Sequence, residues 1–327
     1  MSLRMKYWGV RGSLPSSPTP AQNAVELEAT LRRFFQSGFS LPSQIPEFLA
    51  KSQMPDLGGY GTATTSVEVT TTQGSQIIID CGSGIRNLGE QMMKGPAAQG
   101  KATIHIFLTH FHWDHLIGLP FFTPIFIPGN RVNFYAVQPE LEAMIRGLFK
   151  RPYFPVAFES LGADLHFYPI QPRQPMLIDD ITITPYQLDH PDPCWGFKVQ
   201  SGGKSYAHCV DTEGIRNTRE AMGADLPLYQ GVDMMYFDAQ YTLPELAEKA
   251  NWGHSAAQIG IDIAFRESIP HILFAHHDPG APTSQIKALQ HQTEEYVRWR
   301  RQQASTNRLT LPELKWAFAH EGLEIKI

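Results

Sequence analysis

The feature that most constrains this chain of 327 residues is an apolar run that ends in four potential metal ligands. Residues 104–109 read IHIFLT and predict a buried strand. His110, His112, Asp114 and His115 follow within six residues. His110 and His112 fall on the same side of an extended chain, and a turn after the strand would aim the other two at a second point close by. Three imidazoles and a carboxylate suit zinc, and also manganese or iron. A strand end that is rich in histidine by chance is the weaker alternative, because only 13 of the 327 residues are His.

The composition indicates one large α/β domain or two small ones, since 42% of the residues are hydrophobic and can form a sizeable core. The net charge of −5 gives no support for a nucleic-acid-binding surface. A small anionic substrate remains compatible with this charge, because a pair of metal ions supplies its own local positive charge.

The cysteines and the hydropathy pattern predict a cytoplasmic protein. Cys81, Cys194 and Cys209 are far apart and odd in number, which favours reduced thiols over a disulfide framework. The sequence contains neither an apolar stretch of 18 residues nor a basic leader followed by an apolar segment. We therefore expect no membrane association.

Apolar strand patterns alternate with helical patterns along the chain, without an internal repeat, which predicts a sheet core covered by helices. Besides 104–109, the predicted strands are 5–10, 64–71, 76–79, 132–137, 165–170, 181–188 and 234–239, strands that open the segments 205–213 and 272–279, and a closing hairpin of 314–319 and 323–327. The predicted helices are 23–35, 85–93, 139–150 and 282–304. Residues 16–60 form a predicted insertion between the first two strands, and it could be a lid over a site or an interface in a homodimer.

Further candidate ligands stand at the ends of later strands. His190 follows the strand 181–188, and Asp211 ends the apolar run that begins at Ser205. His254 precedes Ser255 and Gln258, a capping-box pattern that predicts the start of a helix and an environment that favours an anion. A single histidine at a strand end is more often structural, so these residues alone do not define a site. The tryptophans next to these positions could stack on a base or sugar or simply pack in the core: Trp113, Trp195 and Trp252.

The string HFHWDH at residues 110–115 resembles the His-x-His-x-Asp-His signature of the metallo-β-lactamase superfamily. YWGVRGS at residues 7–13 and HHDP at residues 276–279 resemble a branch of metal-dependent hydrolases related to ribonuclease Z and to cyclic phosphodiesterases. The resemblance spans residue 6 to the C-terminus. It implies an α+β fold, a four-layer αββα sandwich of two mixed β-sheets flanked by helices, built as a single domain over residues 1–327 with the insertion at 16–60.

The resemblance also implies a dinuclear metal site and supporting residues. One ion would be held by His110, His112 and His190, and the other by Asp114, His115 and His276, with Asp211 bridging both. Asp80 would support the ligand loop through hydrogen bonds. The alignment favours His276 over its neighbour His277 as the ligand, and His277 would lie behind the ligands or in the pocket wall.

The implied activity is that of a phosphodiesterase that cleaves a small or cyclic phosphodiester with a hydroxide shared by two Zn or Mn ions, although Fe also suits the ligands. Asp114, Asp211 and His254 would be catalytic. The His254 motif favours a phosphodiester substrate over a carbonyl substrate. A thioester or lactone hydrolase with the same metal core is an alternative, and so is a non-catalytic metal-binding sensor module. We expect a small anionic phosphodiester as the substrate rather than a nucleic acid, because no basic, Gly-rich arm for transfer RNA is evident. True metallo-β-lactamases lack the bridging aspartate, so antibiotic hydrolysis ranks low.

Overall fold

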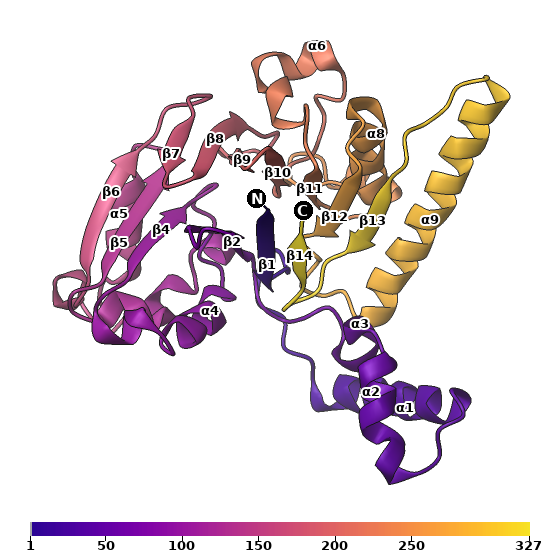
Figure 1. Ribbon diagram of the computed structural model, residues 1–327, viewed down its shortest axis with the longest axis horizontal. Coiled ribbons are helices and arrows are strands. Elements are labelled where there is room, and N and C mark those ends of the chain that lie inside the picture. Colours follow the sequence, from indigo (N-terminus) through magenta and orange to yellow (C-terminus); the bar gives the residue numbers. More distant parts are fainter. Residues whose placement is uncertain (1) are drawn as a thin grey trace.

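The computed structural model describes residues 2–327, whose strands form two mixed sheets of seven strands each (Figure 1). The first sheet has the order β14-β1-β2-β3-β4-β5-β6 and the second the order β13-β12-β11-β10-β9-β8-β7. The strands of the first sheet are β1 Leu3–Gly9, β2 Ser66–Thr71, β3 Gln76–Ile79, β4 Thr103–Phe107, β5 Arg131–Ala136, β6 Asp164–Pro169 and β14 Glu324–Lys326. Those of the second are β7 Met176–Ile178, β8 Ile181–Gln187, β9 Trp195–Ser201, β10 Lys204–Cys209, β11 Met234–Asp238, β12 His271–Ala275 and β13 Lys315–Phe318.

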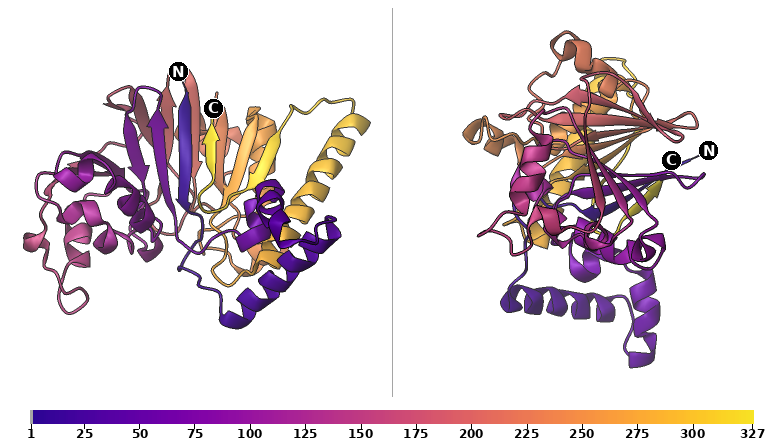
Figure 2. Two further views of the ribbon diagram at one scale, coloured as in Figure 1. Left: turned by 60° about the horizontal axis from the view of Figure 1, so that its bottom comes forward. Right: turned by 90° about the vertical axis from the view of Figure 1, so that its left-hand side faces the viewer.

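The two sheets pack face to face, and helices cover their outer faces (Figures 1 and 2). Fully buried side chains such as Tyr7, Phe107, Phe197 and Tyr236 fill the space between the sheets. The outer face of the first sheet packs on α4 and α5, and that of the second on α8 and α9. The helices are α1 Pro20–Gln36, α2 Ile45–Lys51, α3 Met54–Gly58, α4 Ile85–Met92, α5 Leu141–Leu148, α6 Arg219–Met222, α7 Leu243–Glu248, α8 Ala257–Glu267 and α9 Thr283–Thr306. The predicted αββα sandwich is confirmed.

Parallel strands bring several strand ends to one edge of the sandwich. In the first sheet β3, β4 and β5 are parallel, and in the second β10, β11 and β12 are parallel. β8 runs in the same direction as β10, because both are antiparallel to β9. At this edge the Trp195 N–H donates to the Thr109 carbonyl oxygen over 3.1 Å and joins the two sheets. Residues that follow these strands therefore meet across both sheets.

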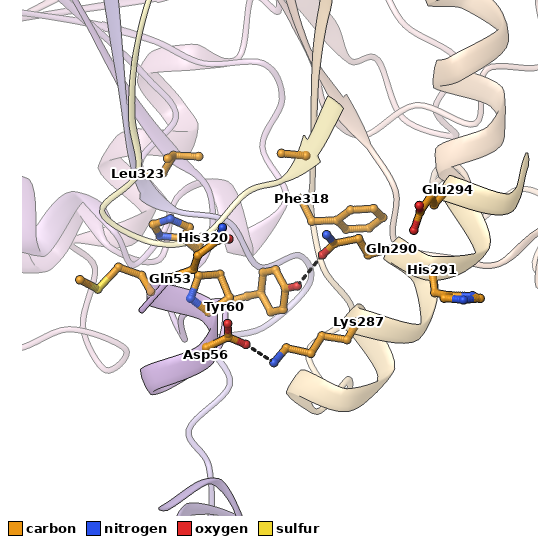
Figure 3. A pocket seen from close by; sticks show the side chains of 13 residues that line it. Gln53, Asp56, Tyr60, Lys287, Gln290, His291, Glu294, Phe318, His320 and Leu323 are labelled. Atoms are coloured by element: carbon orange, nitrogen blue, oxygen red, sulfur yellow. Dashed lines mark hydrogen bonds and ion pairs between the residues drawn. The ribbon is translucent and has the colours of Figure 1, made fainter. Parts of the chain in front are cut away.

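Residues 16–60, called the arm below, project from the body of the molecule (Figures 1 and 2). Its helices enclose a small aromatic cluster in which Phe34 and Phe48 are buried. The arm meets α9 through an ion pair of Asp56 with Lys287 and a 3.0 Å hydrogen bond from the Tyr60 hydroxyl to Gln290 (Figure 3). Within residues 2–327 no helix combines the length and apolar character needed to cross a bilayer.

The structure agrees with most predicted strands, but the predicted closing hairpin is wrong. The strands around residues 66–79 pair antiparallel as expected. β13, in contrast, pairs in parallel with β12 in the second sheet, and β14 pairs with β1 in the first. The turn around His320 therefore carries the chain from one sheet to the other. The pattern of residues 314–327 matches either arrangement, and distant pairing partners decide between them. The three-residue strand β7 and the seven-residue strand β9 are not among the predicted strands.

Candidate metal centre

The structure brings together all seven predicted ligands at the edge where the parallel strands end. His110 and His112 follow β4, and Asp114 and His115 lie in the short 3₁₀ turn that comes next. The other three follow strands of the second sheet: His190 after β8, Asp211 after β10 and His276 after β12. Potential ligand atoms lie within 4.8 Å of one another in two groups, His110, His112, His190 and Asp211, and Asp114, His115, Asp211 and His276. We call these seven residues the candidate metal centre.

Asp211 belongs to both groups, and each of its carboxylate oxygens faces a different one. Its Oδ2 lies 3.4 Å from Nε2 of His110 and 3.7 Å from Nε2 of His190. Its Oδ1 lies 2.9 Å from Nε2 of His276 and 3.2 Å from Nε2 of His115. A carboxylate with one oxygen directed at each group has the geometry required to bridge two cations.

The backbone at three strand ends adopts a left-handed conformation that non-glycine residues rarely use. The φ angles are +63° at Asp80, +60° at Asp211 and +60° at His276. Each such residue costs free energy that the surrounding structure must supply, and such strain concentrates at functional sites. Each of these residues follows a strand, and its side chain contacts the cluster.

One ring nitrogen of most histidines in the centre is held by a polar partner outside it. Asp80 Oδ2 lies 2.9 Å from Nδ1 of His115, and the Thr109 hydroxyl lies 3.1 Å from Nδ1 of His110. Asp80 Oδ1 also accepts the Thr109 N–H over 2.9 Å, so one buried carboxylate links both groups. Partners of this kind fix the ring orientation and leave the opposite nitrogen free to bind a metal.

His112 and His276 are held in the same way by residues that the sequence did not single out. Asp192 Oδ2 lies 2.8 Å from Nε2 of His112, and Gln240 Oε1 lies 2.8 Å from Nδ1 of His276. The Ser13 N–H donates to Asp114 Oδ2 over 2.7 Å. Ser13 ends the YWGVRGS motif, which offered a signal for its position. Asp192 stands two residues beyond the predicted ligand His190, and this proximity in the sequence was its only signal.

Within residues 2–327, several buried polar atoms of the centre make no hydrogen bond, although other atoms of the centre lie 2.9–3.7 Å from them. These are Nε2 of His110, His115 and His190 and Oδ1 of Asp211. Buried polar atoms are nearly always paired, so a group of unpaired ones at a single point needs an explanation. All four atoms are electron-pair donors of the type that divalent transition metals bind. The residues present therefore fit a metal site.

The electrostatics of the centre also favour cations. Burial disfavours a charged His115, but Asp211, Asp114 and Asp80 outweigh burial and raise its pKa well above the usual range. The same competition, with Asp211 and Asp114 opposing burial, raises the pKa of His276 to about 10. Burial and the neighbouring His115 hold the pKa of His110 well below its usual range. The carboxylates thus require positive charge next to them, and a divalent ion supplies it.

Asp238 and His254 adjoin the centre. Asp238 ends β11, and its Oδ2 lies 3.0 Å from Nδ1 of His254. The ring of His254 stacks on that of His276, with centroids 4.7 Å apart. Asp211, Asp238, His254 and His276 form a third buried group of potential ligands. His254 thus lies beside the bridging carboxylate and is oriented by a buried aspartate.

The capping box predicted at Ser255 and Gln258 is wrong. α8 begins at Ala257, and its N-cap residue Ala256 offers no side-chain hydrogen bond. The Ser255 hydroxyl instead donates to the Glu213 carbonyl oxygen over 3.1 Å, and its N–H donates to Asp238 Oδ1 over 3.0 Å. Ser255 therefore fastens the His254 loop to its neighbours rather than starting the helix.

The remaining predicted residues occupy different environments. The His277 side chain donates to the Ala319 carbonyl oxygen over 2.8 Å and packs against Tyr60 and Phe318, so its described contacts do not join it to the ligands. Trp195 is buried. Trp113 and Trp252 are exposed.

Comparison with known proteins agrees with this geometry. A model of the beta-lactamase superfamily domain matches residues 75–277. Ribonuclease Z of Azobacteroides pseudotrichonymphae is 24% identical over 255 residues, which cover 66% of this chain and 83% of that protein.

Two solved structures share the fold over the whole length of this chain. The metallo-beta-lactamase fold protein YhfI from Bacillus subtilis is 13% identical, with a TM-score of 0.62 and coverage of 100% of both chains. A diphosphatase from the PhnP family is 20% identical, with a TM-score of 0.57 and coverage of 100% of this chain and 98% of that one. Because the family model covers most of the chain and the fold agrees, this protein belongs to the beta-lactamase superfamily and is a hydrolase related to ribonuclease Z.

Proposed function

We propose that this protein is a phosphodiesterase that hydrolyses a small or cyclic phosphodiester at a centre for two divalent ions, Zn or Mn, with Fe also compatible. The observation that carries the proposal is the pair of buried donor groups that share Asp211, with unpaired nitrogens on His110, His115 and His190. A site for a single ion would need no carboxylate with one oxygen aimed at each of two groups.

In this proposal His110, His112 and His190 would hold one ion, Asp114, His115 and His276 would hold the other, and Asp211 would contact both. Two bound divalent ions lower the pKa of water towards neutrality and offset negative charge on phosphate oxygens. The protein orients the ligands through Asp80, Thr109, Asp192 and Gln240, so little reorganisation is needed during the reaction.

His254 is proposed to protonate the leaving oxygen. Asp238 lies 3.0 Å from its Nδ1 and accepts the proton there, so the second proton of the imidazolium resides on Nε2. A histidine held in this way can donate that proton to an alkoxide that departs beside the centre. A thioester yields a thiolate, which leaves readily without protonation, so a dedicated proton donor favours a phosphodiester substrate.

The relatives named ribonuclease Z support a phosphodiester as the bond that is cleaved. They do not support the expectation from the net charge that nucleic acid is an unlikely substrate. We therefore include RNA among the substrates to be tested.

The test measures metal content and hydrolysis together. The wild-type protein, Asp211→Asn and His254→Ala are analysed for bound metal and assayed with bis(p-nitrophenyl) phosphate, cyclic nucleotides, short RNA and a thioester. We expect about two ions per wild-type chain, and loss of metal and turnover in Asp211→Asn. His254→Ala should retain metal, and its turnover of cyclic nucleotides and short RNA, which release an alkoxide, should fall about 10²–10⁴-fold. Its turnover of bis(p-nitrophenyl) phosphate should change little, because p-nitrophenolate leaves without protonation. Hydrolysis of the thioester alone, or metal binding without any turnover, would contradict the proposal.

A further inference from the structure

The two most exposed of the six tryptophans flank the candidate metal centre. Trp113 is 80% exposed and Trp252 is 63% exposed. Trp195 is buried, Trp8 and Trp316 are partly buried, and only Trp299 on α9 is also exposed, at 50%. An indole ring left in water forgoes a large hydrophobic gain, so two of them beside one site indicate a binding role.

Both tryptophans are exposed and adjoin residues of the centre in the chain or in space. Trp113 directly follows His112, whose side chain is 44% exposed, whereas the other ligand side chains are nearly inaccessible. Trp252 precedes Gly253, whose backbone packs closely against His190. A Cβ atom on Gly253 would lie only 2.4 Å from Cδ2 of His190. The rings of His112 and His190 are only 4.8 Å apart. The two tryptophans therefore stand on two different loops, each within one or two residues of the backbone that contacts or carries this pair of histidines.

Backbone hydrogen bonds order the loops that carry both tryptophans. The Trp113 carbonyl oxygen accepts the N–H groups of Leu116 and Ile117, over 3.0 and 2.7 Å. On the other side the Gly253 N–H donates to Glu213 over 3.1 Å. A ring whose backbone is already ordered loses less entropy when it stacks on a ligand.

The chemistry of the indole faces determines what they would bind. They offer planar, apolar surfaces and carry no charge, and the exposed charged group next to His112 is the carboxylate of Asp192. Such a surface does not attract a phosphate backbone, but it stacks on aromatic bases of any sequence. From this arrangement, which rests on the proposed function, we infer that Trp113 and Trp252 stack on nucleobases next to the scissile phosphodiester. The substrate is then a phosphodiester that carries a base, and not an alkyl or base-free sugar phosphodiester.

The experiment compares two phosphates that differ only in the base. AMP and ribose 5-phosphate are titrated calorimetrically into the metal-loaded wild-type protein, Trp113→Ala, Trp252→Ala and the control Trp299→Ala. We expect each of the first two substitutions to weaken AMP binding about 5- to 150-fold, with a smaller effect on ribose 5-phosphate. Trp299→Ala should leave both affinities unchanged. Trp113→Phe and Trp252→Phe keep a stacking surface and should recover most of the AMP affinity.

The results separate this inference from the proposed function. If phosphodiesters are hydrolysed but AMP binds no more tightly than ribose 5-phosphate, or the two alanine variants weaken both ligands equally, the inference is wrong and the function stands. If AMP binding depends on the tryptophans but no phosphodiester is hydrolysed, the function fails and base recognition stands. Competition of a cyclic mononucleotide and of a single-stranded RNA 3′ end against AMP distinguishes a free nucleotide from the end of a chain as the source of the base.

Discussion

Asp80→Asn should weaken both ion sites, because a single buried carboxylate orients a ligand in each. Asp80 accepts the Thr109 N–H on Oδ1 and lies against Nδ1 of His115 through Oδ2. Asparagine has only one accepting oxygen, so the variant must lose one of these two contacts. If the amide group donates to Nδ1 of His115, the ring proton moves to Nε2, which then cannot bind a cation. Asparagine tolerates a positive φ, so the backbone at +63° is preserved and the substitution tests the carboxylate alone.

The expected magnitude follows from the role of such partners. Loss of a residue that orients a metal ligand typically lowers metal affinity about 10- to 100-fold, or roughly 1.4–2.7 kcal/mol. The Thr109 hydroxyl relays the effect, because it contacts both Asp80 and Nδ1 of His110. Thr109→Val removes this hydroxyl but keeps the backbone N–H. The same hydroxyl lies 3.4 Å from Nδ1 of His115, but Asp80 still holds that nitrogen over 2.9 Å. We therefore expect Thr109→Val to weaken the ion at His110, His112 and His190 more than the other ion.

The assay is a competition titration with a chromophoric chelator, fitted with two sites, and metal content is measured separately. Asp180→Asn serves as the matched control and should bind both ions as the wild type does, because the hydrogen bonds of Asp180 among the described residues go to Thr71, Ser75 and Ser201 and not to the centre. If Asp80→Asn keeps both affinities within twofold of the wild type, Asp80 does not orient the ligands and the reasoning is wrong. Equal losses at both sites in Thr109→Val would show that the hydroxyl is not a selective link to His110.

Four other perturbations test the wider structure. Asp225→Asn removes the carboxylate that Arg173 and Arg216 share, although Arg216 keeps its ion pair with Asp189. Because both arginines are partly exposed, we expect the free energy of unfolding to fall by roughly 1–2 kcal/mol in chemical denaturation, and an unchanged midpoint would contradict this. Burial raises the pKa of Asp180, but hydrogen bonds from hydroxyl groups on both sheets outweigh burial and hold this pKa below its usual value. The contribution of the Asp180 carboxylate to stability is therefore present above about pH 4 and is lost as the pH falls through the lower folded pKa. Asp180→Asn should therefore flatten the dependence of stability on pH below about pH 4, measured by denaturation between pH 5 and 2.5. We propose that the arm is an insertion into a single domain. Replacing residues 18–57 by a short Gly-Ser linker should then change the free energy of unfolding by less than about 2 kcal/mol. A larger loss would show that the arm belongs to the core. Removal of metal with a chelator should lower Tm. A ligand that binds only the folded state stabilises it by about 4 kcal/mol when the free ligand concentration is 1,000 times Kd. An unchanged Tm would argue against bound ions.

The sequence allowed the prediction of the ligands more readily than of the residues that orient them. His110, His112, Asp114 and His115 fall within six positions after an apolar run, so a local pattern identified them. No local sequence pattern identifies Asp192 as a residue that orients a ligand. Its role depends on the turn after β8, which brings it within 2.8 Å of His112, 80 positions earlier in the chain.

The fold shows the same contrast between local and long-range information. The antiparallel pair β2 and β3 was predictable, because a short turn joins two alternating apolar segments. The partners of β13 and β14 were not, because the two strands join different sheets whose neighbours are distant in the sequence. The cap of α8 failed for a similar reason: Ser255 hydrogen-bonds to Glu213, 42 positions away, and not to its own helix.

The position of the candidate metal centre depends on how the two sheets pack. The ligands around His110 and His115 follow a strand of the first sheet, whereas His190, Asp211 and His276 follow strands of the second. Each donor group therefore combines residues from both sheets, and their relative position depends on side chains such as Phe107 and Phe197 between the sheets, whose rings lie 5.7 Å apart. Protein interiors are close-packed, so a shift between the sheets would change the distances from Asp211 to both groups at once. The apolar core is thus a determinant of the ligand geometry, although none of its side chains is a ligand.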